Sequence, residues 1–264
     1  MQMQKQAGTA RQAGAQPTAG DLALIHRYSR TELPAQDVYI FAATLCDNEI
    51  DRDGERFTIE ALHTLATLFV GKTGIFDHSG KTGDQVMRVF ETWVEESAAQ
   101  RTADGKPYAA LHAKVYILRG PENEALIRAI DGGIKKEISV SCAVQSVKCS
   151  VCGKPFAREG CTHRKGAVYD GAVCHAVLEH PTDAYEFSFV AIPAQPAAGV
   201  RKNKHPEVKI VPPTPTTHTP AASPQAKSEC PTDALQRQLW MPLETEENLA
   251  FKMSGVESGR KAGI

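Results

Sequence analysis

The chain has 264 residues, enough for one large or two small domains, and 42% of them are hydrophobic, which supports a buried core. A formal net charge of −1 argues against a dedicated nucleic-acid-binding protein, which normally carries a basic excess. No apolar run approaches the roughly 20 residues that cross a bilayer, and the N-terminus lacks the apolar segment of a signal peptide. We therefore expect an intracellular protein that binds neither membrane nor nucleic acid, and whose seven cysteines stay reduced.

The N-terminal third begins with a segment that has little capacity to pack. Residues 1–20 are rich in Gln, Ala and Gly, so we expect disorder there, followed by a short helix over 21–30. Residues 38–46 are rich in β-branched and aromatic side chains and predict a buried strand. Residues 58–70 carry apolar side chains at helical spacing, which predicts an amphipathic helix packed on a sheet. Thr58 is its candidate N-cap and Gly71 its stop.

The elements of the middle of the chain follow from apolar alternation, helical spacing and the Gly or Pro residues at their ends. We expect strands over 86–94 and 108–118, a helix over 121–130, a long strand over 135–147 and a last strand over 184–192. In the long strand, Ser139 and Ser141 lie on the face opposite Ile138 and Val140, because successive side chains of a strand alternate.

The C-terminal part differs in composition from the rest. Residues 201–233 form a Pro/Thr-rich linker without packing capacity, and residues 234–264 form a tail in which a short helix is expected. The domain organisation is thus an N-terminal arm over 1–35, a folded domain over 36–200, the linker and the tail.

Four cysteines fall within one short segment, about residues 148–176, that contains too little apolar surface to fold alone. The CSVC pair followed by Gly153 is typical of a zinc-knuckle turn. A closed tetrahedral site, structural rather than catalytic, is predicted from Cys149, Cys152, Cys161 and His163. Cys174 is an alternative fourth ligand. We expect zinc to hold this segment as an insertion in the folded domain.

A second group of residues has the chemistry of a serine nucleophile. Such a serine needs a base within hydrogen-bond reach and a group that orients the base. The candidates are Ser139 or Ser141 on the long strand, His78 in a Gly-flanked loop and Glu186 on the last strand. Each has an ordinary structural interpretation when it is taken singly, because a lone histidine or a strand carboxylate is usually a packed or solvent-facing residue.

The order of these motifs resembles the tailed-phage prohead (capsid maturation) proteases, a family that shares the fold of the herpesvirus assemblins. The resemblance covers about residues 36–200. It rests on the acidic turn DNEIDRDGERF, on FDHSG, on GGIKKEISVSC and on YEFSFVAIPAQP, in that order. It implies an α+β, mainly β, fold, in which an assemblin-like β-barrel has flanking helices and the small zinc-knuckle insertion.

The resemblance also implies roles for the candidate residues. Ser139 matches the nucleophile of the family, His78 its general base and Glu186 the carboxylate of the phage branch. The family commonly has Gly two places after the nucleophile, where this chain has Ser141, so the choice between the two hydroxyls stays open. Two residues shortly before Glu186 are fallback third members of the site: His180 and Asp183.

The function that the resemblance implies is a Ser-His-Glu endopeptidase that processes scaffold and major capsid proteins inside the assembling prohead, in the host cytoplasm. Catalysis would need no cofactor. Family members often act as homodimers and remove their own tails, which would fit the linker and tail of this chain. Two alternatives from other classes remain: a catalytically inactive assembly protein with a zinc knuckle, and a zinc-dependent hydrolase.

Overall fold

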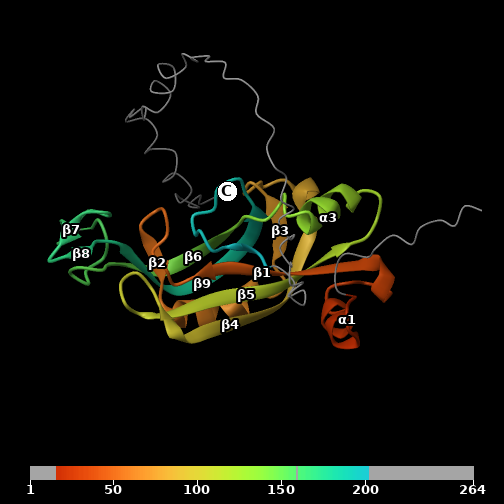
Figure 1. The fold of residues 1–264 in the computed structure, drawn as a ribbon, viewed down its shortest axis with the longest axis horizontal. Helices are drawn as coiled ribbons and strands as arrows, with labels where there is room; N and C mark the ends of the chain where they lie inside the picture. The colour runs from red at the N-terminus through yellow and green to blue at the C-terminus, as the bar shows by residue number, and fades with distance from the viewer. Residues whose placement is uncertain (1–15, 159, 202–264) are drawn as a thin grey trace, which may run out of the picture. The chain divides into compact units, whose positions relative to one another are not determined.

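The computed structural model describes residues 16–158 and 160–201 (Figure 1). The fold is mixed α+β and mainly sheet, with 42% strand and 17% helix. The helices are α1 (Ala19–Ile25), α2 (Ile59–Phe69) and α3 (Glu124–Asp131), with single 3₁₀ turns at Ala35–Asp37 and Thr82–Asp84. The strands are β1 (Val38–Asp47), β2 (Glu55–Phe57), β3 (Thr73–Phe76), β4 (Met87–Arg101), β5 (Pro107–Leu118), β6 (Ile138–Cys149), β7 (Val168–Tyr169), β8 (Ala172–Val173), β9 (Ala176–Phe189) and β10 (Gly199–Val200).

Eight of these strands form one sheet, in the order β10-β1-β5-β4-β3-β9-β2, with β6 paired to the other edge of β9. The expected closed β-barrel is wrong, because the sheet does not close on itself. Only an isolated bridge between Glu137 and Gly199 links the start of β6 to β10. Since β10 has two residues, the edge of β6 from Ser139 to Ser146 has no strand partner among the described residues.

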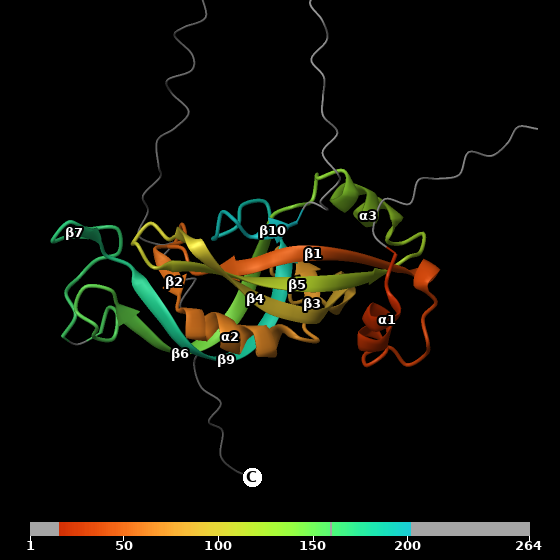
Figure 2. The same ribbon diagram turned by 60° about the horizontal axis from the view of Figure 1, so that its bottom comes forward.

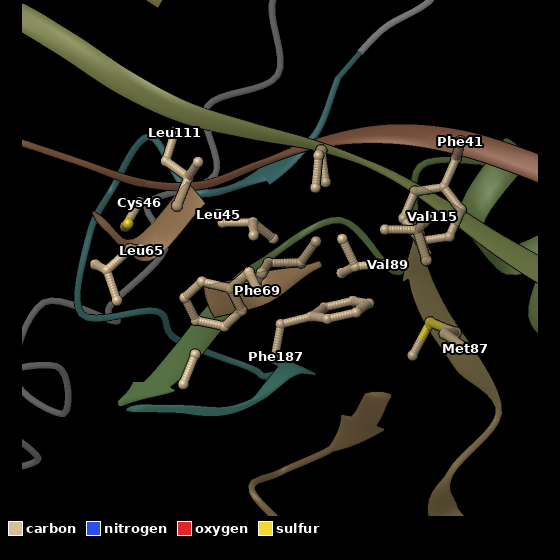
Figure 3. Close-up of a cluster of buried hydrophobic side chains, with 14 of the residues drawn as sticks. Phe41, Leu45, Cys46, Leu65, Phe69, Met87, Val89, Leu111, Val115 and Phe187 are labelled. Carbon is tan, nitrogen blue, oxygen red and sulfur yellow. The ribbon is translucent and has the colours of Figure 1, made fainter. Parts of the chain in front are cut away.

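The hydrophobic core lies on the inner face of this curved sheet (Figure 3). Apolar side chains from β1, β4, β5 and β9 meet there, and α2 adds the face formed by its buried residues Ala61, Leu62, Leu65 and Phe69. Phe187 of β9 is fully buried in this cluster. Burial of one such aromatic side chain stabilises a fold by roughly 2–3 kcal/mol. The inner face of β9 is therefore fixed by packing, which in turn fixes the direction of the side chains on its outer face.

The helices begin where the sequence provides caps. The Thr58 side chain accepts the backbone N–H of Ala61 at the start of α2, as predicted, and α2 packs against β9, β4 and β5 (Figure 2). The short N-terminal helix α1 begins with a capping box between Thr18 and Asp21. Its buried Ile25 packs in a smaller cluster with residues of β1, β4 and β5.

Several predicted boundaries are wrong. The polar residues 97–101 were expected in a loop, but β4 continues through them to Arg101, and the turn to β5 is confined to residues 102–106. The last strand was expected to start at residue 184, but β9 starts at Ala176, because pairing with β6 extends through Pro181 by means of a bulge. The predicted linker and tail, apart from residue 201, and residues 1–15 of the arm lie outside the described residues.

The cysteine-rich segment connects β6 to β9, between Cys149 and Ala176. It contains the two-stranded sheet of β7 and β8, at one end of the β6–β9 pair (Figure 1). The insertion predicted over about residues 148–176 covers this segment. In the described part of the chain, every helix is too short or too polar to span a bilayer.

Candidate functional site

The antiparallel pairing of β6 with β9 places the predicted serine and carboxylate side by side. Ser139 lies opposite Ser188, and Ser141 lies opposite Glu186. Residues that face each other in an antiparallel pair have Cβ atoms about 4.5–5.5 Å apart on the same face of the sheet. All four side chains therefore share the outer face, because the intervening Phe187 points into the core.

His78 reaches this face from the other side of β9. It follows β3, which pairs in parallel with β9, and sits in the turn from Phe76 to Ser79, closed by a hydrogen bond from the Ser79 N–H to the Phe76 carbonyl at 2.9 Å. Asp77 and His78 have positive φ angles of 48° and 52°. A left-handed conformation costs a non-glycine residue about 1–2 kcal/mol, so the surrounding structure must hold this turn in place.

The histidine and the carboxylate form a direct pair. The His78 Nδ1–H donates to Glu186 Oε1 at 2.7 Å, a short, charge-assisted contact. The His78 side chain is 43% exposed, whereas that of Glu186 is 11% exposed. The hydrogen bond to Glu186 raises the pKa of His78 above its ordinary value of 6.5; burial opposes this shift, and the charges of Glu186 and Asp77 add to it. The arrangement fixes the tautomer, because Nδ1 carries the proton and Nε2 is left as the acceptor.

The hydroxyls of the two strand serines make no hydrogen bonds within the described residues. Within the described ranges, neither the Ser139 nor the Ser141 hydroxyl has a hydrogen-bond partner, and His78 Nε2 has none either. Both serines are partly exposed. Ser139 lies opposite Ser188, which accepts the His78 backbone N–H, whereas Ser141 lies opposite Glu186, the partner of Nδ1. The register thus places both serines opposite residues that contact His78, without a hydrogen bond from either hydroxyl to Nε2, and leaves both as candidates.

The fallback residues lie elsewhere. The Asp183 carboxylate accepts from Lys72 Nζ at 3.1 Å and from the backbone N–H of Ala184. His180 lies beside α2 in a hollow that also contains Thr58 and Glu179. Neither contacts His78 or Glu186, so the structure brings Glu186 to the histidine and does not bring the two alternatives.

One residue of this site escaped the sequence analysis. The Ser188 hydroxyl donates to Glu186 Oε2 at 2.6 Å and accepts the backbone N–H of His78 at 3.0 Å. Its side chain is fully buried. The available signal was its position two residues after Glu186 on a strand, which puts both on one face. Alternation alone would give Glu186 the ordinary solvent-facing position of a strand carboxylate, but it is only 9% exposed and bonds to His78.

A groove runs along the unpaired edge of β6. Its volume is about 390 Å³, and it extends from Ser139 and Ser141 to Val147. The opposite wall comes from the loop after β9, including Ala194 and Gln195, and from the acidic turn between β1 and β2. An unpaired strand edge presents backbone N–H and C=O groups that can pair with an extended peptide.

The predicted metal ligands form a separate cluster at the other end of β6. The ligand atoms of Cys149, Cys152, Cys161 and His163 all lie within 4.8 Å of one another. Cys174 is also near, with its Sγ 3.8 Å from that of Cys149. Ser139 and Cys149 are ten positions apart on one strand, so roughly 33 Å separate them along β6.

The cluster has the donor set and the spacing for a metal ion. In a tetrahedral zinc site with Zn–S bonds of about 2.3 Å, the thiolate sulfurs lie about 3.8 Å apart, so small side-chain movements would complete the geometry. His163 Nδ1 is buried without a hydrogen-bond partner, and a buried nitrogen of this kind is costly unless something binds it. Three thiolates and one imidazole are typical ligands of structural zinc. The residues can therefore bind a metal.

Comparison of the chain with protein-family models, with curated proteins and with solved structures gives no match. The assignment of a function therefore depends on the residues of the two sites and on their geometry.

Proposed function

We propose that the protein is a serine endopeptidase in which Ser139, His78 and Glu186 act together, and that it processes scaffold and capsid proteins during phage prohead maturation. One observation carries the proposal of enzymatic activity: the hydrogen bond of 2.7 Å from His78 Nδ1 to Glu186 Oε1. It lies beside β6, whose Ser139 and Ser141 hydroxyls make no hydrogen bonds within the described residues. The phage and prohead part rests on the order of sequence motifs that resembles the prohead proteases.

The mechanism is acyl transfer. Nε2 of His78 accepts the proton of the Ser139 hydroxyl while Oγ forms a bond to the carbonyl carbon of the substrate peptide. The imidazolium then protonates the amine, and the C–N bond breaks to leave an ester on Ser139. Water, deprotonated by the same nitrogen, then attacks this ester. The C–O bond to Ser139 breaks, the imidazolium returns the proton to Oγ, and the carboxylic acid product is released. Glu186 holds the Nδ1–H tautomer and stabilises the imidazolium between these steps, as its hydrogen bond to Nδ1 allows.

The groove along β6 supports an extended protein segment as the substrate. Its length from Ser139 to Val147 would let several substrate residues pair with the free strand edge, with one peptide bond next to the serine. Such a site suits protein substrates that contain an exposed, unstructured segment. The proposed substrates are the scaffold and capsid proteins and the chain's own residues beyond 201.

For the metal cluster we propose a structural zinc ion, with Cys149, Cys152, Cys161 and His163 as ligands and Cys174 as the alternative fourth ligand. Four protein ligands leave no open position for a substrate, and zinc bound in this way contributes folding free energy to the segment between β6 and β9. The separation of roughly 33 Å along β6 from Ser139 favours this structural role over participation in the serine chemistry.

The proposal is tested by mass spectrometry of the full chain co-expressed with the scaffold and major capsid proteins of its phage. We expect defined cleavages in the wild type that disappear in Ser139→Ala and persist in Ser146→Ala, a matched control on the same strand whose hydroxyl bonds to Glu179. Cleavage that survives Ser139→Ala but not Ser141→Ala would move the nucleophile by two residues. Absence of cleavage from every folded variant would contradict the protease and favour an inactive assembly protein.

A further inference from the structure

Ser188 makes contact with both members of the His78–Glu186 pair. Its hydroxyl donates to Glu186 Oε2 at 2.6 Å, while Glu186 Oε1 accepts from His78 Nδ1 at 2.7 Å. The same hydroxyl oxygen accepts the His78 backbone N–H at 3.0 Å. The three residues thus form a closed ring of hydrogen bonds, in which one buried hydroxyl connects the carboxylate to the main chain of the histidine.

Ser188 cannot be the nucleophile, although it is a serine within the site. Its side chain is 0% exposed, so a peptide carbonyl has no access to it. A hydroxyl has one proton to donate, and the proton of Ser188 is directed at Glu186 rather than at a ring nitrogen. Its role must therefore act through its neighbours.

The two hydrogen bonds of Ser188 restrict two different motions: rotation of the Glu186 carboxylate and movement of the His78 turn. A carboxylate on a flexible Glu side chain can rotate about its last torsion, and a hydrogen bond to each oxygen removes that rotation. The His78 turn has two residues at positive φ, and its backbone N–H groups hold it to β9. The Asp77 N–H donates to the Phe189 carbonyl at 3.0 Å, and the His78 N–H donates to the Ser188 hydroxyl. Without the Ser188 hydroxyl, the Glu186 carboxylate could rotate. The strained turn that carries His78 would also lose the acceptor of its backbone N–H.

We propose that Ser188 is a positioning residue that aligns Glu186 and the His78 ring for proton transfer. The proposal deepens the proposed function, since it assigns a fourth member to the same site. It gives the buried serine a role that packing alone does not require, because alanine would fill nearly the same space without the hydroxyl.

The expected effect of Ser188→Ala is a fall in kcat of about 10–100-fold with KM nearly unchanged, because a misplacement of about 1 Å can cost 100-fold in rate. Ser188→Thr retains the hydroxyl and should restore most of the rate. Ser146→Ala is the matched control, because it also removes a serine–carboxylate hydrogen bond. Its bond, from Ser146 of β6 to Glu179 of β9, is remote from His78. In a Glu186→Gln background, loss of the Ser188 hydroxyl should cost little further rate, since the serine acts through the carboxylate.

A second readout does not depend on turnover. We would titrate the His78 ring by NMR in the full-length Ser139→Ala protein, with His78→Gln used to assign the signal. The hydrogen bond to Glu186 is the largest cause of the raised pKa of His78, and the charges of Glu186 and Asp77 also act on the ring. Ser188→Ala should therefore move the pKa of His78 down toward 6.5, whereas Ser146→Ala and Ser188→Thr should leave it unchanged.

The outcomes separate the positioning role from the protease itself. A lowered pKa of His78 in Ser188→Ala supports the positioning role even if no peptidase activity is found, which would contradict only the proposed function. An unchanged pKa of His78 in the folded variant overturns the positioning role. Equal additional loss of kcat in the wild-type and Glu186→Gln backgrounds would also overturn it, because that result describes a general structural effect. If Ser188→Ala does not fold, Ser188→Cys supplies the same titration with a weaker hydrogen-bond donor.

Discussion

Gly74→Ala should disturb the core and the site together. Gly74 lies in β3, directly opposite Met87 on one neighbouring strand and Phe187 on the other. A Cβ atom at this position would lie 2.3 Å from Phe187 Cζ and 2.8 Å from Met87 Cβ. Ordinary carbon contacts are about 3.5–4.0 Å, so the Phe187 ring would have to move by roughly 1.2–1.7 Å in a packed core (Figure 3). Overpacking of this kind costs about 1–3 kcal/mol.

The displacement would reach the site because Phe187 lies between Glu186 and Ser188 in the chain. The assay is urea denaturation followed by circular dichroism, with the midpoint and slope compared between variants. Gly83→Ala is the matched control, since a Cβ there meets nothing within 4 Å. Phe187→Leu removes the ring atoms that clash, although the contact with Met87 Cβ remains, so in the Gly74→Ala background it should cost less than it does alone. The reasoning is refuted if Gly74→Ala is as stable as Gly83→Ala, or if the double variant shows simple additivity.

The same structure makes four further predictions. Because the Glu186 hydrogen bond raises the pKa of His78, peptidase activity should fall on acidification, with its midpoint above pH 6.5. In Glu186→Gln the midpoint should move to lower pH, and the maximum rate should be lower. The free energy of unfolding should depend on pH in the opposite direction. The stabilisation from the His78–Glu186 pair is complete below pH 6.5 and is lost as the pH rises through the raised pKa of His78. Urea midpoints measured across this pH range would detect the loss. Gln195→Ala removes two buried hydrogen bonds to the backbone of Asp47, at 2.6 and 2.9 Å. It should lower the free energy of unfolding, measured by denaturation, by about 1–3 kcal/mol. A decrease of less than about 0.5 kcal/mol would contradict the anchoring of the loop after β9 by these bonds. Chelation should expose the segment between Cys149 and Ala176 to limited proteolysis while the rest of the sheet stays protected, and protection of that segment in metal-free protein would argue against a structural metal.

Much of the fold follows from local patterns in the sequence. The helix after Thr58 and the strand β5 were predicted because their apolar side chains recur with a clear period. The strand β1 was predicted because it is rich in β-branched and aromatic side chains. The boundaries of β4 and β9 were not. The extension of β4 is polar and that of β9 contains Pro181, and both depend on pairing with a neighbouring strand rather than on their own composition. Closure of the sheet is a long-range property, and the sequence motifs alone predicted a barrel that the strand pairing does not form.

The site was partly predictable for the same reason. His78 and Glu186 were singled out, and the structure brings them together across 108 positions of chain. The contact depends on the parallel register of β3 with β9, which has no signature in the residue types. It also depends on positive φ angles at Asp77 and His78, two residue types that adopt such angles more often than most but do not predict them. Ser188 had no chemical signal, since a serine on a strand is common and its importance comes from its burial between two other residues. The metal cluster was easier, because cysteine spacing reports the local turn directly.

The central claim is that Ser139 is a nucleophile activated by His78, and covalent labelling tests it most directly. We would treat the folded full-length protein with a fluorophosphonate and locate the adduct by fragmentation of the tryptic peptide Glu137–Lys148, which contains Ser139, Ser141 and Ser146. The account predicts one adduct, on Ser139, that disappears in His78→Gln, with Ser146 unmodified as the internal control. Failure of the native protein to form any adduct, or an adduct whose rate is unchanged in His78→Gln, would contradict it.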